Sequence, residues 1–168
     1  MVAGKSRLSL ALAAAVALGL GLSACARHSA DSDLAAGAGY GAASPGSVQE
    51  FNQTVGDRVF FDTDQTDLSP AAQATLDKQA AWLNQYGRYS FIIEGHADER
   101  GTREYNFALG ARRAQAVHDY LVAKGVSPSR MRTISYGKER PVAVCDDISC
   151  WSQNRRAVTV LNGAAPAS

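Results

Sequence analysis

The sequence has little excess of charge in either sign. Its 168 residues include 17 basic and 16 acidic side chains, which gives a formal net charge of +1. Proteins that bind nucleic acid carry clustered lysines and arginines on one face or along one helix. This balance therefore argues against nucleic acid as a partner.

Cysteine is scarce as well, and the three that occur are Cys25, Cys145 and Cys150. A structural zinc site needs about four ligands, which a single nearby pair of cysteines does not supply. Cys145 and Cys150 are separated by four residues, and in an exported protein this spacing favours a short disulfide loop. A pair of buried free thiols is the alternative.

Long apolar runs are missing except near the N-terminus, where residues 8–22 follow Lys5 and Arg7. This run is shorter than the ~20 residues that a membrane-spanning helix needs, and no basic flank follows it. A basic start, an apolar centre and small residues before a cleavage site are typical of a secretory signal peptide. The segment "LSAC", which ends at Cys25, resembles the lipobox of bacterial lipoproteins. The resemblance implies a signal peptide over residues 1–24 and a lipid anchor on Cys25.

Cleavage before Cys25 removes two basic residues and no acidic one, which leaves 15 basic and 16 acidic residues. The alternative is an ordinary secreted protein in which the cysteine near the cleavage site is coincidental. In lipoproteins of this kind an aspartate after the cysteine usually signals retention in the inner membrane, whereas Ala26 follows here. We therefore expect a lipoprotein of the outer membrane whose folded part faces the periplasm.

A flexible tether is expected over residues 25–55. Residues 26 to about 46 are mainly Ala, Gly, Ser and Asp, which cannot bury enough surface to offset the entropy lost on ordering. One folded domain over residues 56–162 and a short tail over residues 163–168 complete the chain.

Strands and helices alternate within the expected domain. Ser69 and Pro70 are an N-cap and a first helical residue, and Gly87 and Gly125 are helix stops. The expected elements are a strand over 57–62, a helix over 70–86, a strand over 89–94, a helix over 105–124, and strands over 131–136 and 156–161. The second helix is expected to turn Phe107, Ala114, Val117 and Leu121 toward the core. This order predicts an α+β fold, a two-layer α/β sandwich with two main helices on one face of about four strands. It does not give the sheet order.

The densest polar segment is "IEGHADERGTREYN", residues 93–106. Asp98 lies in the loop after a strand, and the following helix carries Asn106, Leu109 and Arg113 on one face. A fixed carboxylate opposite a guanidinium suits a zwitterion, because the acid accepts from an ammonium and the arginine binds a carboxylate through two parallel hydrogen bonds. The alternative is that Asp98 and Arg113 pair with each other or cap the helix.

Four segments carry a resemblance to a known family: "VFFDTDQTDLS", "IEGHADERGTREYNFALGARRAQAVHDYL", "SYGKERP" and "NRRAV". In content and order they resemble the peptidoglycan-associated lipoproteins of the Tol-Pal system, whose domain is of the outer-membrane-protein-A-like type. The resemblance covers about residues 56–161. It implies non-covalent binding of the diaminopimelate stem peptide of peptidoglycan, without a cofactor or metal. It also implies TolB and other Tol-Pal components as partners, and a role in envelope integrity and cell division.

The resemblance also implies which residues bind the ligand. Asp98 would hold the ammonium of the diaminopimelate end and Arg113 its carboxylate. The full implied set is Asp64, Asp98, Asn106, Leu109, Arg113 and Arg155. Two features depart from the family pattern: Thr63 stands where some members carry an aromatic residue, and the "CDDISC" segment is an insertion expected to staple the loop before the last strand.

An enzyme that uses His96, Asp98 and Glu99 as acid, base or metal ligands is the main alternative function. No further ligands occur at a persuasive spacing, and no glycine-flanked serine nucleophile is present. We therefore expect a binding protein and not an enzyme, with His96 as a buried hydrogen-bonding residue beneath the loop. A cell-wall anchor outside the Tol system is a second alternative.

Overall fold

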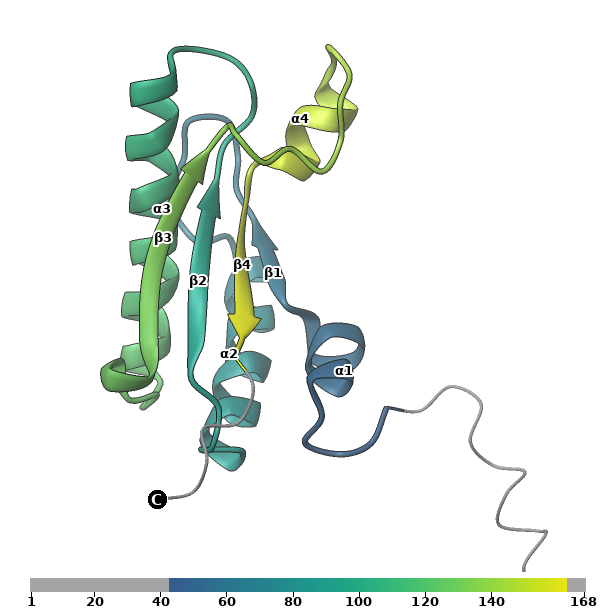
Figure 1. Ribbon diagram of the computed structural model, residues 1–168, viewed down its shortest axis with the longest axis vertical. Coiled ribbons are helices and arrows are strands. Elements are labelled where there is room, and N and C mark those ends of the chain that lie inside the picture. Colours follow the sequence, from purple (N-terminus) through teal and green to yellow (C-terminus); the bar gives the residue numbers. More distant parts are fainter. Residues whose placement is uncertain (1–42, 163–168) are drawn as a thin grey trace, which may run out of the picture. The chain divides into compact units, whose positions relative to one another are not determined.

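Four strands form one sheet in a computed structural model that describes residues 43–162 (Figure 1). The strands are β1 (Arg58–Phe60), β2 (Phe91–His96), β3 (Met131–Gly137) and β4 (Arg156–Leu161). Their order in the sheet is β1-β4-β2-β3. β4 runs antiparallel to both of its neighbours, whereas β2 and β3 are parallel.

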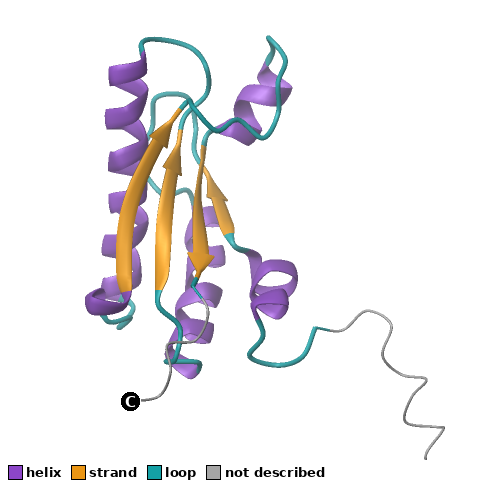
Figure 2. Cartoon of the chain, viewed as in Figure 1, coloured by secondary structure: helices purple, strands orange, loops and turns teal. Residues whose placement is uncertain are grey.

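Two helices, α2 (Pro70–Gln85) and α3 (Arg103–Ala123), cover one face of the sheet (Figure 2). Ser69 caps α2 by accepting a hydrogen bond from the Ala72 amide, so the expected start of this helix is confirmed. Thr102 caps α3 in the same way, which places its first residue two positions before the expected one. The predicted two-layer α/β sandwich is confirmed. No helix within residues 43–162 covers the opposite face of the sheet.

The parallel pairing of β2 with β3 depends on α3 as the crossover between them. α3 lies close against β2 at two glycines, because a Cβ built at Gly95 would overlap the carbonyl oxygen of Gly110. This contact fixes the depth at which the first half of α3 sits on the sheet. It thereby positions the residues at the start of the helix relative to the end of β2.

The core lies between the sheet and the two helices. Side chains that are less than 2% exposed include Phe51, Leu76, Leu83, Phe91, Ile93, Val117 and Leu121. The expectation that Phe107 faces the core is wrong, because its side chain is 57% exposed. The buried stripe of α3 runs through Asn106 and Arg113, and Phe107 lies about 100° around the helix from Asn106.

The folded part begins before residue 56, the boundary that the sequence predicted. A helical turn, α1 (Val48–Glu50), leads into a π-helical turn, η1 (Phe51–Gly56), and both belong to the expected tether. Phe51 is fully buried, with its ring centre 5.0 Å from that of Trp82, and the Trp82 indole donates to Glu50 Oε2 at 2.7 Å. Residues 1–42 and 163–168 lie outside the described residues, and with them the predicted signal peptide, Cys25, most of the tether and the tail.

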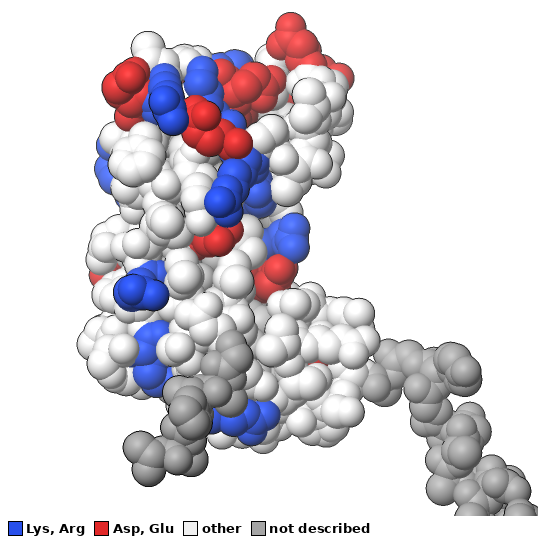
Figure 3. All heavy atoms as spheres, in the orientation of Figure 1, with Lys and Arg blue, Asp and Glu red and all other residues white. Residues whose placement is uncertain are grey.

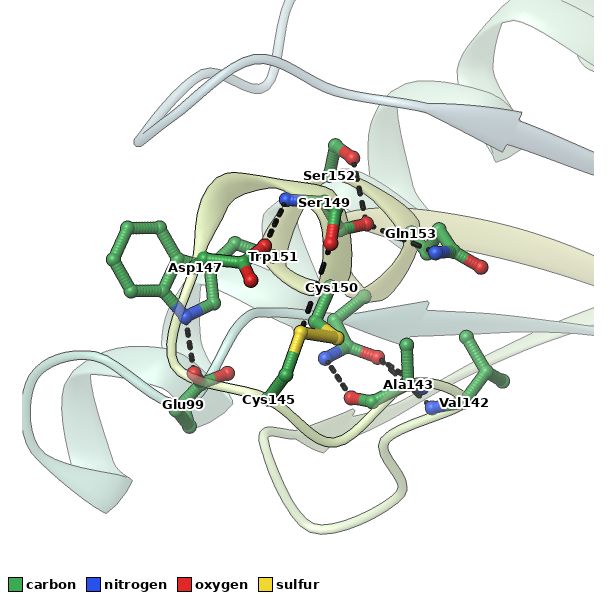
Figure 4. The surroundings of a disulfide bond; sticks show 11 residues. Glu99, Val142, Ala143, Cys145, Asp147, Ser149, Cys150, Trp151, Ser152 and Gln153 are labelled. Atoms are coloured by element: carbon green, nitrogen blue, oxygen red, sulfur yellow. Dashed lines mark hydrogen bonds between the residues drawn. A yellow bond between two sulfur atoms is a disulfide. The ribbon is translucent and has the colours of Figure 1, made fainter.

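A short helix that the sequence did not predict, α4 (Ile148–Asn154), precedes β4. Cys145 and Cys150 form a disulfide at its start, with their Cα atoms 5.7 Å apart (Figure 4). The Asn154 side chain accepts from the Val142 amide and donates to the Ala143 carbonyl, both at 2.8 Å. The disulfide and Asn154 thus tie both ends of α4 to the preceding loop. Across residues 43–162 no helix is long and apolar enough to span a membrane.

Candidate ligand-binding site

The candidate site lies where β2 ends and the loop toward α3 begins. Figure 3 shows that acidic and basic side chains gather at the end of the domain that carries α4 and this loop. Asp98, in the loop, is only 6% exposed and lies within a network of arginines. The network is assembled from three separate parts of the chain: this loop, α3 and Arg155, which directly precedes β4.

Asp98 is held by two guanidinium groups. Arg100 donates from Nε to Oδ1 at 3.1 Å and from Nη2 to Oδ2 at 2.6 Å, and Arg155 donates from Nη1 to Oδ2 at 3.3 Å. Burial raises the pKa of the Asp98 carboxyl, but the hydrogen bonds from Arg100 and Arg155 outweigh burial and hold this pKa below its usual value. Asp98 is therefore a carboxylate at neutral pH, with a cation already bound to it.

Arg113 is fully buried and donates only to backbone carbonyls among the described residues. Its Nε, Nη1 and Nη2 donate to the oxygens of Gln65, His96 and Asp62 at 2.9, 2.8 and 3.0 Å. Burial, followed by the charge of Arg155, lowers the pKa of Arg113 to about 10, so it stays protonated at neutral pH. Its guanidinium thus fastens the β1–α2 loop to the end of β2. The alternative in which Asp98 and Arg113 pair directly is not what the structure contains.

The remaining predicted residues surround this pair. Asn106 is buried and donates from Nδ2 to the Arg100 carbonyl at 2.6 Å, while Leu109 is buried on the same face of α3. Asp64 has a φ of +56°, in the left-handed region, and accepts from the Tyr105 hydroxyl at 3.3 Å. Asn106 therefore shapes the Arg100 loop, and Asp64 lies at the exposed edge of the site.

Two contributors, Arg100 and Trp151, were missed by sequence reasoning, and Glu99 was considered only as part of an enzyme. The Arg100 guanidinium lies over the Trp151 ring at 4.1 Å, and the Trp151 indole donates to Glu99 Oε1. Arg100 stands two residues after Asp98, so its position in the sequence was a usable signal for a local ion pair. Trp151 gave no such signal, because its contact depends on α4 folding back toward the loop.

His96, Asp98 and Glu99, the three residues of the enzyme hypothesis, make separate contacts. The His96 ring is 2% exposed and stacks on Tyr136 with ring centres 5.6 Å apart, whereas Asp98 binds arginines and Glu99 binds Trp151. His96 is buried as expected, but the expected hydrogen bond is wrong, because neither ring nitrogen has a hydrogen-bond partner among residues 43–162, although Glu94 Oε2 lies 3.5 Å from Nε2. Within the same residues no group of three or more His, Cys, Asp or Glu side chains could hold a metal ion.

Arg113 is the one arginine of the network that makes no ion pair among the described residues. Arg100, Arg113 and Arg155 lie around Asp64, Asp98 and Glu99, so the formal charges balance, but Arg100 and Arg155 bind the Asp98 carboxylate and Arg113 does not. Burying a guanidinium against neutral carbonyls is costly unless an anion offsets its charge. The site can therefore accept an anionic group near Arg113, while an ammonium could take the place of Arg100 on Asp98. Such exchange requires the Arg100 side chain, 40% exposed, to move aside.

Comparison with known proteins gives consistent matches. Residues 60–155 match the model of the OmpA family. The chain is 73% identical over 128 residues to the peptidoglycan-associated lipoprotein of Rhizobium meliloti, covering 76% of this chain and 73% of the relative. It is 47% identical over 131 residues to the protein of the same name from Pseudomonas aeruginosa, covering 76% and 77%.

Solved structures agree with the fold. The crystal structure of the peptidoglycan-associated lipoprotein from Burkholderia pseudomallei matches with a TM-score of 0.63 at 40% identity, covering 66% of this chain and 96% of that one. The C-terminal domain of Helicobacter pylori MotB matches with a TM-score of 0.60 at 22% identity, covering 65% and 86%, which is a likeness of fold alone.

Proposed function

Because this chain belongs to the peptidoglycan-associated lipoproteins of the OmpA family, we propose that it binds peptidoglycan without covalent attachment and anchors the outer membrane to the cell wall. The membership itself bears out the resemblance read from the sequence motifs. The observation that carries the proposal is the Asp98 carboxylate, held between Arg100 and Arg155 beside the buried Arg113 guanidinium, which donates only to backbone carbonyls among the described residues.

The ligand end that fits this network is the zwitterionic end of diaminopimelate in the stem peptide. Its ammonium would replace the Arg100 guanidinium on Asp98, which exchanges one charge-assisted hydrogen bond for another. Its carboxylate would offset the buried charge of Arg113 after the β1–α2 loop has moved away from the guanidinium. Asp64 and Asn106 would border the bound group, and Leu109 would support it from within the helix face.

Replacement of Asp98 by Asn tests this assignment, because Asn keeps the shape of the side chain and removes its charge. Charge-assisted contacts are worth about 1.5–3 kcal/mol each, so binding to sacculi should weaken by roughly tenfold to a hundredfold. The mature chain, made soluble by Cys25→Ser, would be used in the pull-down, with melting temperature as the measure of folding. Asp77→Asn, on α2 at an exposed ion pair with Lys124, is the matched control. Unimpaired binding by a folded Asp98→Asn protein would remove Asp98 from the site.

Arg113 needs a different probe. Arg113→Lys keeps the charge but lacks the planar fork that donates to three carbonyls on the β1–α2 loop and β2, so it would lower stability together with binding. Amidation of the terminal carboxylate of the ligand leaves the protein intact. We expect the amide to bind roughly tenfold or more weakly than the free acid, and equal binding would exclude Arg113 from carboxylate recognition.

Attachment to the outer membrane would come from acyl chains on Cys25, since two or more chains anchor a protein stably where one does not. Cys25→Ser should abolish acyl labelling and release the chain from membranes. For the wider system, we propose that the domain takes part with TolB in the Tol-Pal complex and so contributes to envelope integrity and cell division. Pull-down of TolB by the soluble chain separates this assignment from a general cell-wall anchor.

Catalysis is the second class of function, and the site does not favour it. His96 is neutral at pH 7, because burial and then the charges of Arg156 and Arg140 lower its pKa to about 4, and its ring stacks on Tyr136. Asp98 is paired and ionised, so it is poorly suited to donate a proton. Cleavage of muropeptides by the purified chain, with or without divalent metal, would contradict the binding assignment.

A further inference from the structure

A hollow of about 380 Å³ lies beside the candidate site and is not explained by it. It is formed by the end of β1, the loop between β1 and α2, and α4. The lining residues that matter here are Phe60, Asp62, Asp67, Ser69, Gln153 and Arg155. Its volume falls within the ~300–1,000 Å³ range of small-molecule sites. Of the residues implied for diaminopimelate, it contains only Arg155.

The polar groups of the hollow are mostly hydrogen-bond acceptors without partners. Within residues 43–162 the carboxylates of Asp62 and Asp67 make no side-chain hydrogen bond or ion pair, and both residues are exposed. Gln153 donates its amide nitrogen to the Ser149 carbonyl at 2.9 Å, which leaves its amide oxygen available. A ligand that fits must therefore bring donors, as hydroxyl and amide groups do.

Phe60 supplies the apolar part of the hollow. Its side chain is 49% exposed although it lies in an edge strand next to the core. A flat aromatic face packs well against the C–H face of a saturated ring, and such contacts add to ordinary apolar burial. Asp62 and Asp67 outnumber the one arginine of the hollow, Arg155, which is paired with Asp98, and this balance disfavours an anionic ligand. The combination suits a neutral, hydroxyl-rich ring.

We propose that this hollow binds an N-acetylhexosamine unit of the glycan strand, as a subsite separate from the Asp98 site. The inference rests on the proposed peptidoglycan function and extends it from the stem peptide to the sugar. Arg155 connects the two places, since it lines the hollow while its Nη1 lies 3.3 Å from Asp98 Oδ2. A stem of three residues spans roughly 10 Å when extended, so one fragment can reach both subsites.

Binding of N,N′,N″-triacetylchitotriose tests the subsite, because this probe has the β-1,4-linked N-acetylhexosamine units and no peptide. Chemical shifts of the mature Cys25→Ser chain would be followed during titration. Phe60→Ala and Asp67→Ala should each weaken binding at least fivefold. Phe107→Ala and Asp146→Ala are matched controls, since Phe107 is 57% exposed and Asp146 is an exposed acid on another loop. Both controls should bind the probe like the wild type.

The two subsites give distinguishable failures. Asp98→Asn should lose a diaminopimelate tripeptide and keep chitotriose, whereas Phe60→Ala should lose chitotriose and keep the tripeptide. Absence of chitotriose binding overturns the glycan subsite and leaves the peptide assignment in place, and absence of tripeptide binding does the reverse. Spermidine serves as a purely cationic probe of the two carboxylates. The proposal is also overturned if spermidine binds in the hollow and chitotriose does not.

Discussion

Trp151 and Arg100 form a stacked pair, with the guanidinium carbon of Arg100 4.1 Å from the centre of the Trp151 ring. The same guanidinium donates through Nε and Nη2 to the two oxygens of Asp98. Trp151 belongs to α4 and directly follows Cys150, so the disulfide segment contacts the candidate site through Arg100. The disulfide segment therefore affects the side chain of Arg100, which occupies Asp98.

Removal of the Trp151 ring should increase affinity for the diaminopimelate ammonium. Without the ring Arg100 loses a cation–π contact worth about 0.5–1 kcal/mol at an exposed position, so it competes less well for Asp98. Trp151→Ala should therefore bind the ligand about twofold to fivefold more tightly, as measured by calorimetry. Trp151→Phe keeps an aromatic face over Arg100 and should stay close to the wild type. Weaker binding by Trp151→Ala would show that Arg100 assists the ligand instead of competing with it.

Loss of the disulfide should lower stability more than affinity. A disulfide that closes so short a loop lowers the conformational entropy of the unfolded chain, which stabilises the folded state by about 2 kcal/mol. We expect the Cys145→Ser, Cys150→Ser double variant to lose that much free energy of unfolding in urea. The capping of α4 by Asp147, which accepts from the Ser149 amide at 2.7 Å, should keep the helix formed in the native state. Two alkylatable thiols in the exported wild-type protein would contradict the assignment of the bond.

Much of the fold was predictable because its signals are local. The N-cap hydroxyl of Ser69 and the glycines after both long helices fixed the helix ends to within a few residues. α4 was not predictable, since its seven residues have no apolar stripe and it depends on a disulfide and on Asn154. The burial of Phe51 was missed for a related reason. Its partner Trp82 lies 31 positions along the chain, and no periodicity links the two.

Asp98 and Arg113 were predictable members of the candidate site, but Arg100 and Trp151 were not, and neither were the contacts among them. Spacing put Asp98 in a loop before the helix that carries Arg113, and the structure brings both into one network. The sequence could not show that the Arg113 guanidinium donates to three backbone carbonyls. Those oxygens come from β2 and from a loop 48 or more positions earlier in the chain. Nor could it show that Arg155 contacts Asp98 directly.

Acid should destabilise the domain through His96. Burial, followed by the charges of Arg156 and Arg140, lowers the pKa of His96 to about 4, and Glu94 Oε2 at 3.5 Å from Nε2 makes no hydrogen bond that offsets this. In the unfolded chain the His pKa is near 6.5. Between pH 4 and 6.5 the unfolded chain therefore binds a proton at this residue that the folded chain does not bind. The free energy of unfolding should therefore fall by roughly 3 kcal/mol as pH drops from about 7.5 to 4, and His96 should have almost no effect above about pH 7.5.

Urea unfolding between pH 4 and 7.5 measures this dependence. His96→Phe keeps a ring against Tyr136 and cannot titrate, so its stability should change less over the window. His118→Gln, on the surface of α3, should retain the wild-type dependence. The Asp98 carboxyl, whose pKa lies below its usual value, contributes a loss only at lower pH. Parallel curves for His96→Phe and the wild type would contradict the role of His96.

Gly95 should tolerate no side chain, because α3 lies against β2 at this residue. A Cβ at Gly95 would overlap the carbonyl oxygen of Gly110, and it would also lie 3.2 Å from the Ala114 Cβ. Backbone on one side and a packed methyl on the other leave no flexible group to move, so we expect Gly95→Ala to cost ~2 kcal/mol or more. A methyl group at residue 95 would push α3 away from β2. This movement would displace Asn106 and Arg113, so ligand affinity should fall together with stability.

Gly87→Ala is the matched control, since a Cβ there meets no atom within 4 Å. Thermal melting of the two variants separates them, and equal melting temperatures would show that the helix can move away from the sheet without loss.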